Sequence, residues 1–463
     1  MPKDLYIWFQ LIAASALGIA LMYIFYKRFI IAIGFFIITP LFSALMYTNK
    51  EEWINVEVAT GLQGYLRAGI LLSLGLVGIF YFITHWNQHK DKLPVHFIVL
   101  GIFLLFALIS ISYSVDRRYT TIRAFLFLAT SGFLLGLHTW LDNKKKFEQL
   151  FNLLFYYVLI LSLLTLFFVV FEPSRAWWWK EPSRLLGIWD HPAVLGAFCM
   201  ISYPILIWKF TKVGWKGKGL IGLLLIITFL FHVASGSRTT LGTSMFGFIL
   251  WLIISKKFKE LIVASVLVSI FFIGIATSAP ASMRRDKSKG IFFLTERDLI
   301  WKGAIKIIEK SPLIGYGYRV EAKIFDDQKE YDISDLFFIA TAQQPLHSGY
   351  ISIAAGGGLV GLLLWLTLLT IPIYKSLRSN LTIEKGTVAL IMIMLMITNL
   401  TETALTGYQS LTDIMFWIAW VIGGNIYKFD KDFTGSTIED ENENLKLTGE
   451  LVDEKSIHPN YTG

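Results

Sequence analysis

Apolar runs long enough to cross a bilayer recur almost from end to end of this 463-residue chain. A helix of about 20 apolar residues spans the hydrocarbon core of a membrane. Charged residues make up only 16% of the chain, whereas soluble proteins carry roughly 25%. The sequence therefore predicts an all-α integral membrane protein with about 12–13 transmembrane helices and one large extracytoplasmic loop.

The predicted spans follow the apolar runs. They cover residues 5–26, 29–47, 67–86, 93–113, 124–141, 150–171, 193–208, 219–234, 241–255, 261–280, 348–374, 386–400 and 411–427. The first run is too long for the apolar part of a signal peptide, and no small-residue cleavage site follows it, so we expect it to be a span. The first two runs have an alternative arrangement, a re-entrant hairpin, which lowers the count but leaves later loops on the same sides.

Two regions are predicted along the chain: a membrane domain at residues 1–427 and a tail at 428–463. The tail holds 4 Lys against 9 Asp and Glu. It has no apolar periodicity, which is typical of disordered, solvated segments. The single cysteine, Cys199, lies in an apolar run, which argues against disulfides and a cysteine metal site.

The distribution of basic residues predicts the orientation, because Lys and Arg favour short cytoplasmic loops. With the N-terminus outside, 19 of the 29 lysines fall in cytoplasmic loops or the tail. The long loop at 281–346 does not follow this rule, because long loops cross the membrane regardless of charge. We therefore predict an extracytoplasmic 281–346 loop and a cytoplasmic tail.

Arginines show the opposite bias, with 11 of 13 on the predicted outer side. A guanidinium group binds phosphate through two parallel hydrogen bonds. The bias indicates an anionic, phosphorylated ligand outside the cytoplasm; the alternative is chance combined with general lysine usage. The outer arginines are Arg67, Arg117, Arg118, Arg123, Arg175, Arg184, Arg238, Arg284, Arg285, Arg297 and Arg319.

Arg238 lies in a short polar turn, "SGSRTTLG" (235–242), between two predicted spans. A charge near hydrocarbon is costly unless it reaches water or a partner. The turn therefore predicts either a functional arginine or an arginine that extends to the membrane surface and marks a helix end.

The long outer loop contains an amphipathic pattern, "ERDLIWKGAIKIIEK", with apolar residues at helical spacing. Thr295 is suited to the N-cap, and Arg297 falls in the first turn. Pro312, Gly315 and Gly317 in "SPLIGYGY" end the helix in a turn. We predict a helix that lies on the membrane surface.

Three further patterns carry weaker signals. Three consecutive tryptophans in "SRAWWWKEPSR" (174–184) favour an interfacial anchor, with a glycan-stacking surface as the alternative. "GGGLVG" (356–361) matches a dinucleotide-binding pattern by letter, but it lies in a span without a preceding strand. Its Gly357–Gly361 spacing instead predicts close helix packing. His191 and His347 lie at predicted outer span ends, where a histidine is structural or, beside arginines, a general base.

Three of these features occur together in a specific order. The Arg238 turn comes first, then "ERDLIWKGAIKIIEKSPLIGYGYR", then "LHSGYISIAAGGGLVGLLLWL". Over roughly residues 185–425 this order resembles the O-antigen ligase and polysaccharide polymerase superfamily. The resemblance implies transfer of a glycan from an undecaprenyl diphosphate carrier, at the outer face of a bacterial inner membrane, to an acceptor hydroxyl. The partners would be this lipid-linked glycan, a glycan or lipid A core acceptor and the membrane, with no nucleic acid.

The resemblance and the residue chemistry together assign the site. We expect His347 to act as general base and Arg238 and Arg297 to stabilise the diphosphate leaving group. Glu402 is the substitute base, with Asp190 behind it. No H-E-x-x-H, P-loop or EF-hand pattern appears, so we expect neither metal nor cofactor. The residues predicted to bind substrate are Arg184, Arg319, Tyr350 and Trp301.

The chain departs from the family at two places. Ser348 follows His347 where Asn is more common, and Pro345 replaces the first His of the His-x-His-Asn seen in many ligases. "GIWDHPAVLGAF" (187–198) has Asp190 and His191 where relatives read Asn. The "LHSGY" variant favours a polymerase over an O-antigen ligase or a protein glycosyltransferase, and the family carries no catalytic role onto Asp190 or His191. A flippase of lipid-linked glycans is the alternative from another class, and it predicts charges within spans on both sides of the midplane.

Overall fold

The computed structural model describes residues 20–44, 62–86, 93–178, 183–254, 259, 297–324, 346–378, 382–405 and 410–426. Within these residues, seven helices are long and apolar enough to cross a membrane. They are α3 (Leu62–His85), α4 (Val95–Ile109) with the 3-10 turn η3 (Ser110–Ser112), α5 (Arg117–Trp140), α6 (Lys144–Phe171), α8 (Pro192–Lys212), α9 (Trp215–Ser235) and α15 (Gly349–Leu377). The chain is thus a multi-span, all-α membrane protein, as predicted.

Four shorter apolar helices and three short polar segments complete the described fold. The apolar ones are α2 (Phe29–Ala44), α10 (Arg238–Ile254), α16 (Ile383–Thr398) and α17 (Leu411–Asn425). The others are α7 (Pro173–Ala176), α12 (Arg297–Ile308) and α13 (Glu321–Ile324). The predicted span at 261–280, most of the span at 5–26 and the tail at 428–463 lie outside the described residues.

The first two predicted spans meet at a sharp bend. Ala20–Lys27 and Phe29–Leu41 form two helices at 112° to each other. This geometry fits one broken span or a re-entrant loop, so the described residues give up to eight crossings by length and composition. The larger predicted count included the shorter helices α10, α16 and α17 as full spans.

Side-chain caps begin several of the helices. In α5, α6, α15, α16 and α17, a side-chain oxygen accepts a hydrogen bond from the backbone N–H three residues on, which satisfies a group that the helix leaves unpaired. The capping residues are Asp116, Asn143, Ser348, Thr382 and Ser410. Polar residues between apolar runs therefore fix where these helices start.

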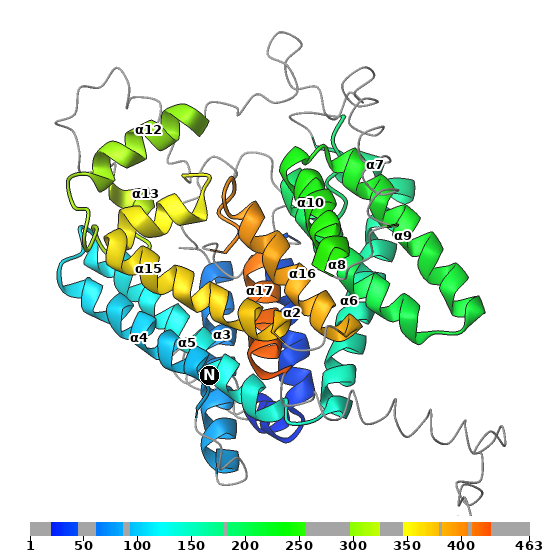
Figure 1. Cartoon of the computed structure of the whole chain (residues 1–463), viewed down its shortest axis with the longest axis horizontal. Helices are drawn as coiled ribbons and strands as arrows, with labels where there is room; N and C mark the ends of the chain where they lie inside the picture. The colour runs from blue at the N-terminus through cyan, green and yellow to red at the C-terminus, as the bar shows by residue number, and fades with distance from the viewer. Residues whose placement is uncertain are drawn as a thin grey trace, which may run out of the picture.

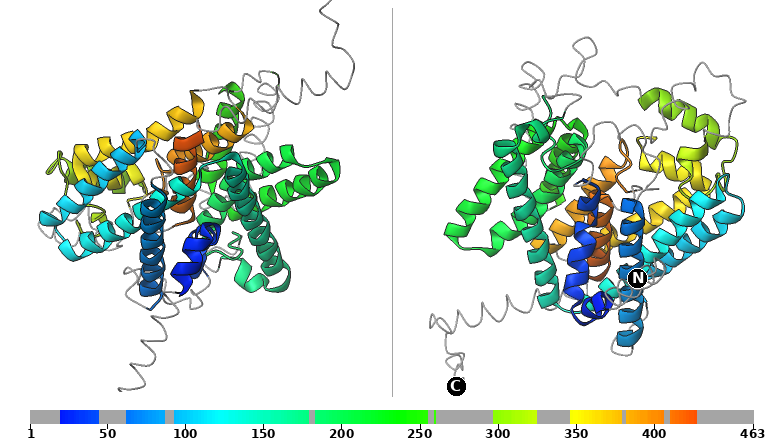
Figure 2. Two further views of the ribbon diagram at one scale, coloured as in Figure 1. Left: turned by 90° about the horizontal axis from the view of Figure 1, so that it is seen from below. Right: turned by 180° about the vertical axis from the view of Figure 1, so that it is seen from behind.

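The helices α16 and α17 lie in the middle of the molecule (Figures 1 and 2). On one side are α4, α5, α12, α13 and α15, and on the other are α6 to α10. The helix α17 packs against α5, α8, α15 and α16. Its Trp417 and Trp420 are buried, and the Trp420 indole donates to the Leu368 carbonyl at 2.8 Å. This buried core holds the two sides together.

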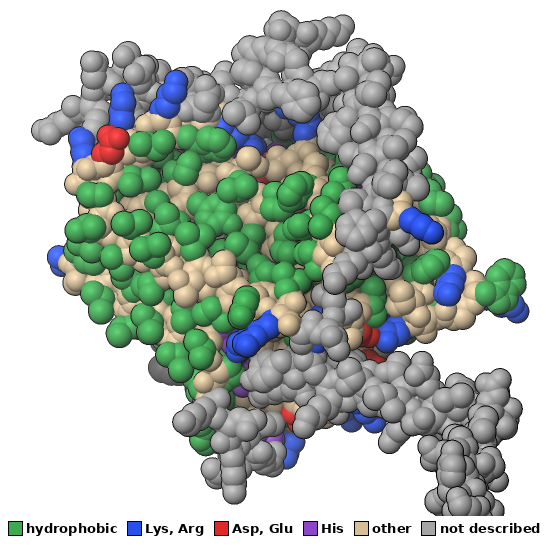
Figure 3. Space-filling model, viewed as in Figure 1, with side chains coloured by type: hydrophobic (Ala, Val, Ile, Leu, Met, Phe, Trp, Pro, Cys, Tyr) green, Lys and Arg blue, Asp and Glu red, His purple; other side chains and the backbone are tan. Residues whose placement is uncertain are grey.

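Polar contacts between helices and loops lie at two ends of the described structure. At one end, the Val115 N–H donates to the Tyr316 carbonyl; at the other, Lys212 pairs with Glu384 at 2.7 Å. Figure 3 shows hydrophobic side chains across the middle and Lys and Arg toward the edges. We call the end with α12 the outer end and the end with Lys212 the inner end, following the predicted orientation.

Candidate functional site

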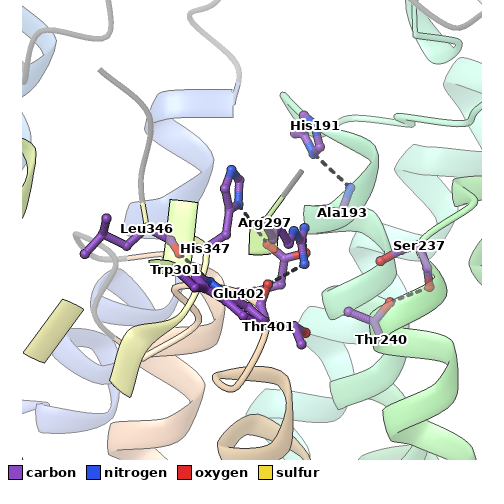
Figure 4. Close-up of polar contacts among 10 residues, drawn as sticks. All are labelled: His191, Ala193, Ser237, Thr240, Arg297, Trp301, Leu346, His347, Thr401 and Glu402. Atoms are coloured by element: carbon purple, nitrogen blue, oxygen red, sulfur yellow. Dashed lines mark hydrogen bonds and ion pairs between the residues drawn. The ribbon is translucent and has the colours of Figure 1, made fainter. Parts of the chain in front are cut away.

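Three polar side chains from distant parts of the sequence meet at the outer end (Figure 4). The guanidinium group of Arg297 donates to the Glu402 carboxylate at 2.7 Å and also to the Thr401 carbonyl. The other carboxylate oxygen of Glu402 lies 3.7 Å from Nδ1 of His347. Glu402 thus bridges the two residues, and we call Arg297, Glu402 and His347 the outer cluster.

The helix α12 holds both the Glu402 side chain and the backbone before His347. Ile300, Ala304 and Ile307 are buried against α15 and its neighbours, which fixes the rotation of the helix. Arg297 and Trp301 lie four residues apart at the border of this buried face, against which Trp301 also packs. The Trp301 indole donates to the Leu346 carbonyl at 2.9 Å, so the same helix holds Glu402 and the backbone before His347.

His347 occupies a strained backbone position. Its φ is +48°, and Arg319 is the other described non-glycine residue with positive φ. A histidine in this region costs of order 1–3 kcal/mol, and such residues concentrate at functional sites. The following residue, Ser348, caps α15, so the strained residue stands directly before a helix start.

The glycine of "LHSGY" joins α15 to the turn that carries Glu402. The Gly349 N–H donates to the Asn399 carbonyl at 2.9 Å and to the Glu402 carbonyl at 3.2 Å. A Cβ at this position would come within 2.0 Å of the Asn399 side chain. Only glycine permits this approach, so Gly349 fixes the distance between His347 and Glu402.

Electrostatics keep Glu402 ionised. Burial on its own would raise the pKa of this carboxyl group, but the neighbouring His347 and Arg297 outweigh it and lower the pKa. A carboxylate accepts hydrogen bonds and cannot donate them. Nδ1 of His347 faces this acceptor at 3.7 Å, which directs Nε2, on the other side of the ring, away from the carboxylate.

The turn after α12 and the glycines of α15 interlock. The helix α15 is broken at Gly358, whose φ is +60°. There the N–H groups of Leu359 and Val360 donate to the carbonyls of Pro312 and Leu313, at 2.8 and 3.1 Å. A Cβ on Gly358 would lie 2.3 Å from the Leu313 backbone. The "SPLIGYGY" turn therefore satisfies the broken helix and anchors α12 above it.

A second wall of the site comes from α8, α9 and α10. The helix α9 ends at Gly236, whose φ is +62°, and α10 begins at Arg238. Arg184 is buried and donates to the Ser235 carbonyl at 2.9 Å, which satisfies the end of α9. Figure 4 shows Ser237 and His191 on this wall, opposite Arg297 and His347.

Residues 221–366 match the family model described as O-antigen ligase. This part of the chain is similar to the O-antigen ligase family. No curated protein sequence matches the chain. The matched segment contains the Arg238 turn, α12 and His347, whereas Glu402 lies beyond its end.

The predicted catalytic residues of the O-antigen ligase domain fall into two places. Arg297 and His347 meet in the outer cluster, and Glu402, predicted only as a substitute base, is the residue that joins them. Arg238 is half-buried at the start of α10, on the opposite wall. Asp190 precedes His191, whose Nδ1 accepts from the Ala193 N–H and caps α8.

The four residues predicted to bind substrate all take part in the architecture around the site. Trp301 and Arg184 donate to backbone carbonyls as described, and the Tyr350 hydroxyl donates to the Met396 carbonyl at 3.0 Å. Arg319 lines a cavity below the outer cluster. Contact between substrate and these four residues stays a prediction.

Gly357 and Gly361 both face the Phe106 ring of α4, which confirms close helix packing at "GGGLVG".

The three consecutive tryptophans are only partly described. Trp178 is buried, with its ring 5.1 Å from that of His191. Trp177 is half-buried and Trp179 lies outside the described residues, so an interfacial anchor at this segment stays a prediction.

Some functional geometry was not predictable from sequence. The backbone carbonyl of Asn399 accepts a hydrogen bond from the Gly349 N–H, and its side-chain oxygen accepts one from the Leu405 N–H. In the sequence, however, a lone Asn at a span end carries no distinctive signal. Within the described residues, no group of three or more His, Cys, Asp or Glu side chains is placed to hold a metal ion.

Proposed function

We propose that this chain transfers a glycan from an undecaprenyl diphosphate carrier to an acceptor hydroxyl at the outer face of the membrane. The observation that carries the proposal is the contact between Glu402 and Nδ1 of His347. This contact orients the ring so that Nε2 acts as a general base, the role that a carboxylate–histidine pair plays in serine hydrolases. The O-antigen ligase match supports glycan transfer in general.

The reaction needs one proton transfer and one substitution. Nε2 of His347 takes the proton from the acceptor hydroxyl as its oxygen attacks the anomeric carbon of the donor sugar. The bond between that carbon and the phosphate oxygen breaks, and its electron pair leaves with undecaprenyl diphosphate. Glu402 stabilises the imidazolium ion that forms. The product is a new glycosidic bond.

The leaving diphosphate gathers negative charge, which arginine forks are suited to stabilise. Arg297 already donates hydrogen bonds to Glu402 and to the Thr401 carbonyl. We therefore assign Arg297 a double role, in which it holds Glu402 and adds positive charge to the site. Arg238, from the opposite wall, is assigned to the diphosphate itself.

The acceptor we favour is a second lipid-linked repeat unit, which makes the enzyme a polymerase of cell-surface polysaccharide. The "LHSGY" sequence supports this choice, because it lacks the His-x-His-Asn of many ligases. Transfer to lipid A core is the second candidate, which the description of the matched family favours. Both use the same His347 chemistry.

A deletion strain distinguishes these possibilities through its glycan profile. A polymerase deletion leaves single repeat units on the carrier, which is the result we expect. A ligase deletion leaves full-length chains on it. A flippase deletion leaves repeat units facing the cytoplasm, and this outcome would contradict glycan transfer altogether.

The side of the membrane is tested by labelling. Lys310 lies exposed at the outer end and Lys216 at the inner end, and the native Cys199 is buried. An impermeant maleimide should label Lys310→Cys but not Lys216→Cys in intact cells. The reverse pattern would place the outer cluster in the cytoplasm and contradict the proposal.

A further inference from the structure

A small cavity lies inside the outer end, separate from the outer cluster. Its volume is about 30 Å³, and its wall includes Arg123, Arg319, Asp413, Tyr318, Trp365 and Trp417. These residues come from α5, α15, α17 and the turn after α12. Leu405, three residues after Glu402, also lines it, so the cavity lies directly beneath the turn that carries Glu402.

The polar groups of the wall are mainly hydrogen-bond donors. Two arginines line the cavity beside a single acidic residue, Asp413, whose carboxylate accepts a hydrogen bond from the Trp417 indole at 3.2 Å. Among the described residues, the buried indole N–H of Trp365 has no hydrogen-bond partner. A buried N–H group normally donates a hydrogen bond, either to the protein or to a bound molecule. The wall therefore suits an occupant that accepts hydrogen bonds.

Packing and hydrogen bonds hold the residues of the cavity wall in place. Arg123 is 9% exposed, and its guanidinium group stacks over the Tyr119 ring at 4.3 Å and donates to its hydroxyl. Arg319 has a φ of +56°, a strained position that packing must maintain. The preceding Tyr318 N–H donates to the Ser110 hydroxyl at 2.9 Å, which holds this strained segment against η3.

The size of the cavity selects among oxyanions. Since one water needs about 10–15 Å³ measured this way, the volume accommodates roughly two water-sized groups. A carboxylate has two oxygens in one plane and fits this space, whereas a phosphate with four does not. Arginine forks match carboxylates in the same planar geometry. Glu321 of α13 interacts electrostatically with Arg123 but does not line the cavity.

We propose that this cavity binds the carboxylate of an acidic sugar residue, so that Arg123 and Arg319 select acidic glycans as substrates. The link to catalysis rests on the proposed glycan transfer, but binding itself does not. Because Leu405 lines the cavity three residues after Glu402, a carboxylate held there would lie near the turn that carries Glu402.

Binding is tested on the purified full-length protein with glucuronate as the probe, and with glucose and inorganic phosphate for comparison. We expect glucuronate alone to bind. Arg123→Lys and Arg319→Lys keep the positive charge but lose the fork, so each should weaken binding about tenfold. Asp413→Asn removes a competing carboxylate and should strengthen it. The matched control is Arg378→Lys, an exposed arginine at the inner end, which should leave binding unchanged.

Equal binding of glucose, preferential binding of phosphate, or unchanged affinity in both arginine variants would each overturn the proposal. A transfer assay separates this outcome from the proposed function. If a carboxyl-reduced donor is used as well as the acidic donor, transfer stands and the selectivity claim fails. If nothing is transferred but glucuronate binding depends on Arg123 and Arg319, the cavity stands and the proposed function fails.

Discussion

The two ends of the molecule each contain a glutamate paired with a cation at 2.7 Å. At the inner end Glu384 pairs with Lys212, and at the outer end Glu402 pairs with Arg297. The Glu384 side chain is 6% exposed and the Glu402 side chain is 25% exposed. Burial of charge therefore does not mark the functional end, since the more deeply buried carboxylate lies at the other one.

Two features separate the outer pair from the inner pair. A histidine lies against the second carboxylate oxygen of Glu402, and the backbone of that histidine is strained. The inner pair joins the end of α8 to the start of α16. An ion pair that ties two helices together contributes to stability, whereas an ion pair beside a strained histidine is organised for chemistry.

The largest expected effect is at His347. Asn tolerates positive φ better than most residues, so His347→Asn preserves the backbone and removes the base. Transfer should fall about 10²–10⁴-fold while the protein stays folded and membrane-inserted. Rates of purified variants with lipid-linked glycan measure this loss. His347→Gln should not restore the rate, and near-normal turnover in either variant would remove His347 as the base.

The next effect sharpens the comparison between the two glutamates. Glu402→Gln leaves His347 without its charged partner and misorients the ring, so transfer should fall about 10²-fold. Its matched control, Glu384→Gln, should lower the melting temperature and leave transfer per folded molecule unchanged. Equal losses of transfer in the two variants would show that both glutamates act only through stability.

Substitution of the two cations, Arg297 and Lys212, should also affect transfer differently, but by a smaller factor. Arg297→Lys keeps the charge but cannot contact both Glu402 and Thr401, so transfer should fall about tenfold. Lys212→Arg at the inner end should retain full transfer. A kinetic assay on both variants, normalised to the amount of folded protein, provides the test. Full activity in Arg297→Lys would mean that the fork geometry is dispensable.

The smallest effect is a dependence of stability on pH. The pKa of Glu402 is lowered in the folded protein, so its contribution to stability is complete above its unfolded value, about 4.3. That contribution is lost as the pH falls through the lower folded value. Thermal melts should therefore show an acid destabilisation below about pH 4 in the wild type, which Glu402→Gln should lack. Identical profiles for the two proteins would contradict the assigned charge state.

Local patterns predicted the helices well. The Arg238 turn, the Arg297 helix and the turn that follows it at Pro312 were predicted from periodicity and turn residues, which act within a few positions of the chain. The predicted N-cap, Thr295, lies outside the described residues. The short apolar helices α10 and α16 were harder to interpret, because composition alone does not distinguish a full crossing from a partial one.

The site was only partly predictable, because it depends on contacts over long sequence distances. Sequence chemistry brought forward Arg297 and His347, but the bridge between them is Glu402, 105 residues from Arg297. Glycine is required at 349 because the Asn399 side chain lies too close for a Cβ. It is required at 358, where α15 breaks, because the Leu313 backbone lies equally close. No local pattern encodes these pairs, since each residue is ordinary until the fold places its partner beside it.

The central claim is that Glu402 and His347 act as one catalytic unit, and a double-mutant cycle measures this directly. Transfer rates are compared for the wild type, His347→Asn, Glu402→Gln and the double variant. If Glu402 acts through His347, the double variant should be no slower than His347→Asn alone, because residues that act as a unit are strongly non-additive. Multiplication of the two single losses in the double variant would contradict the account.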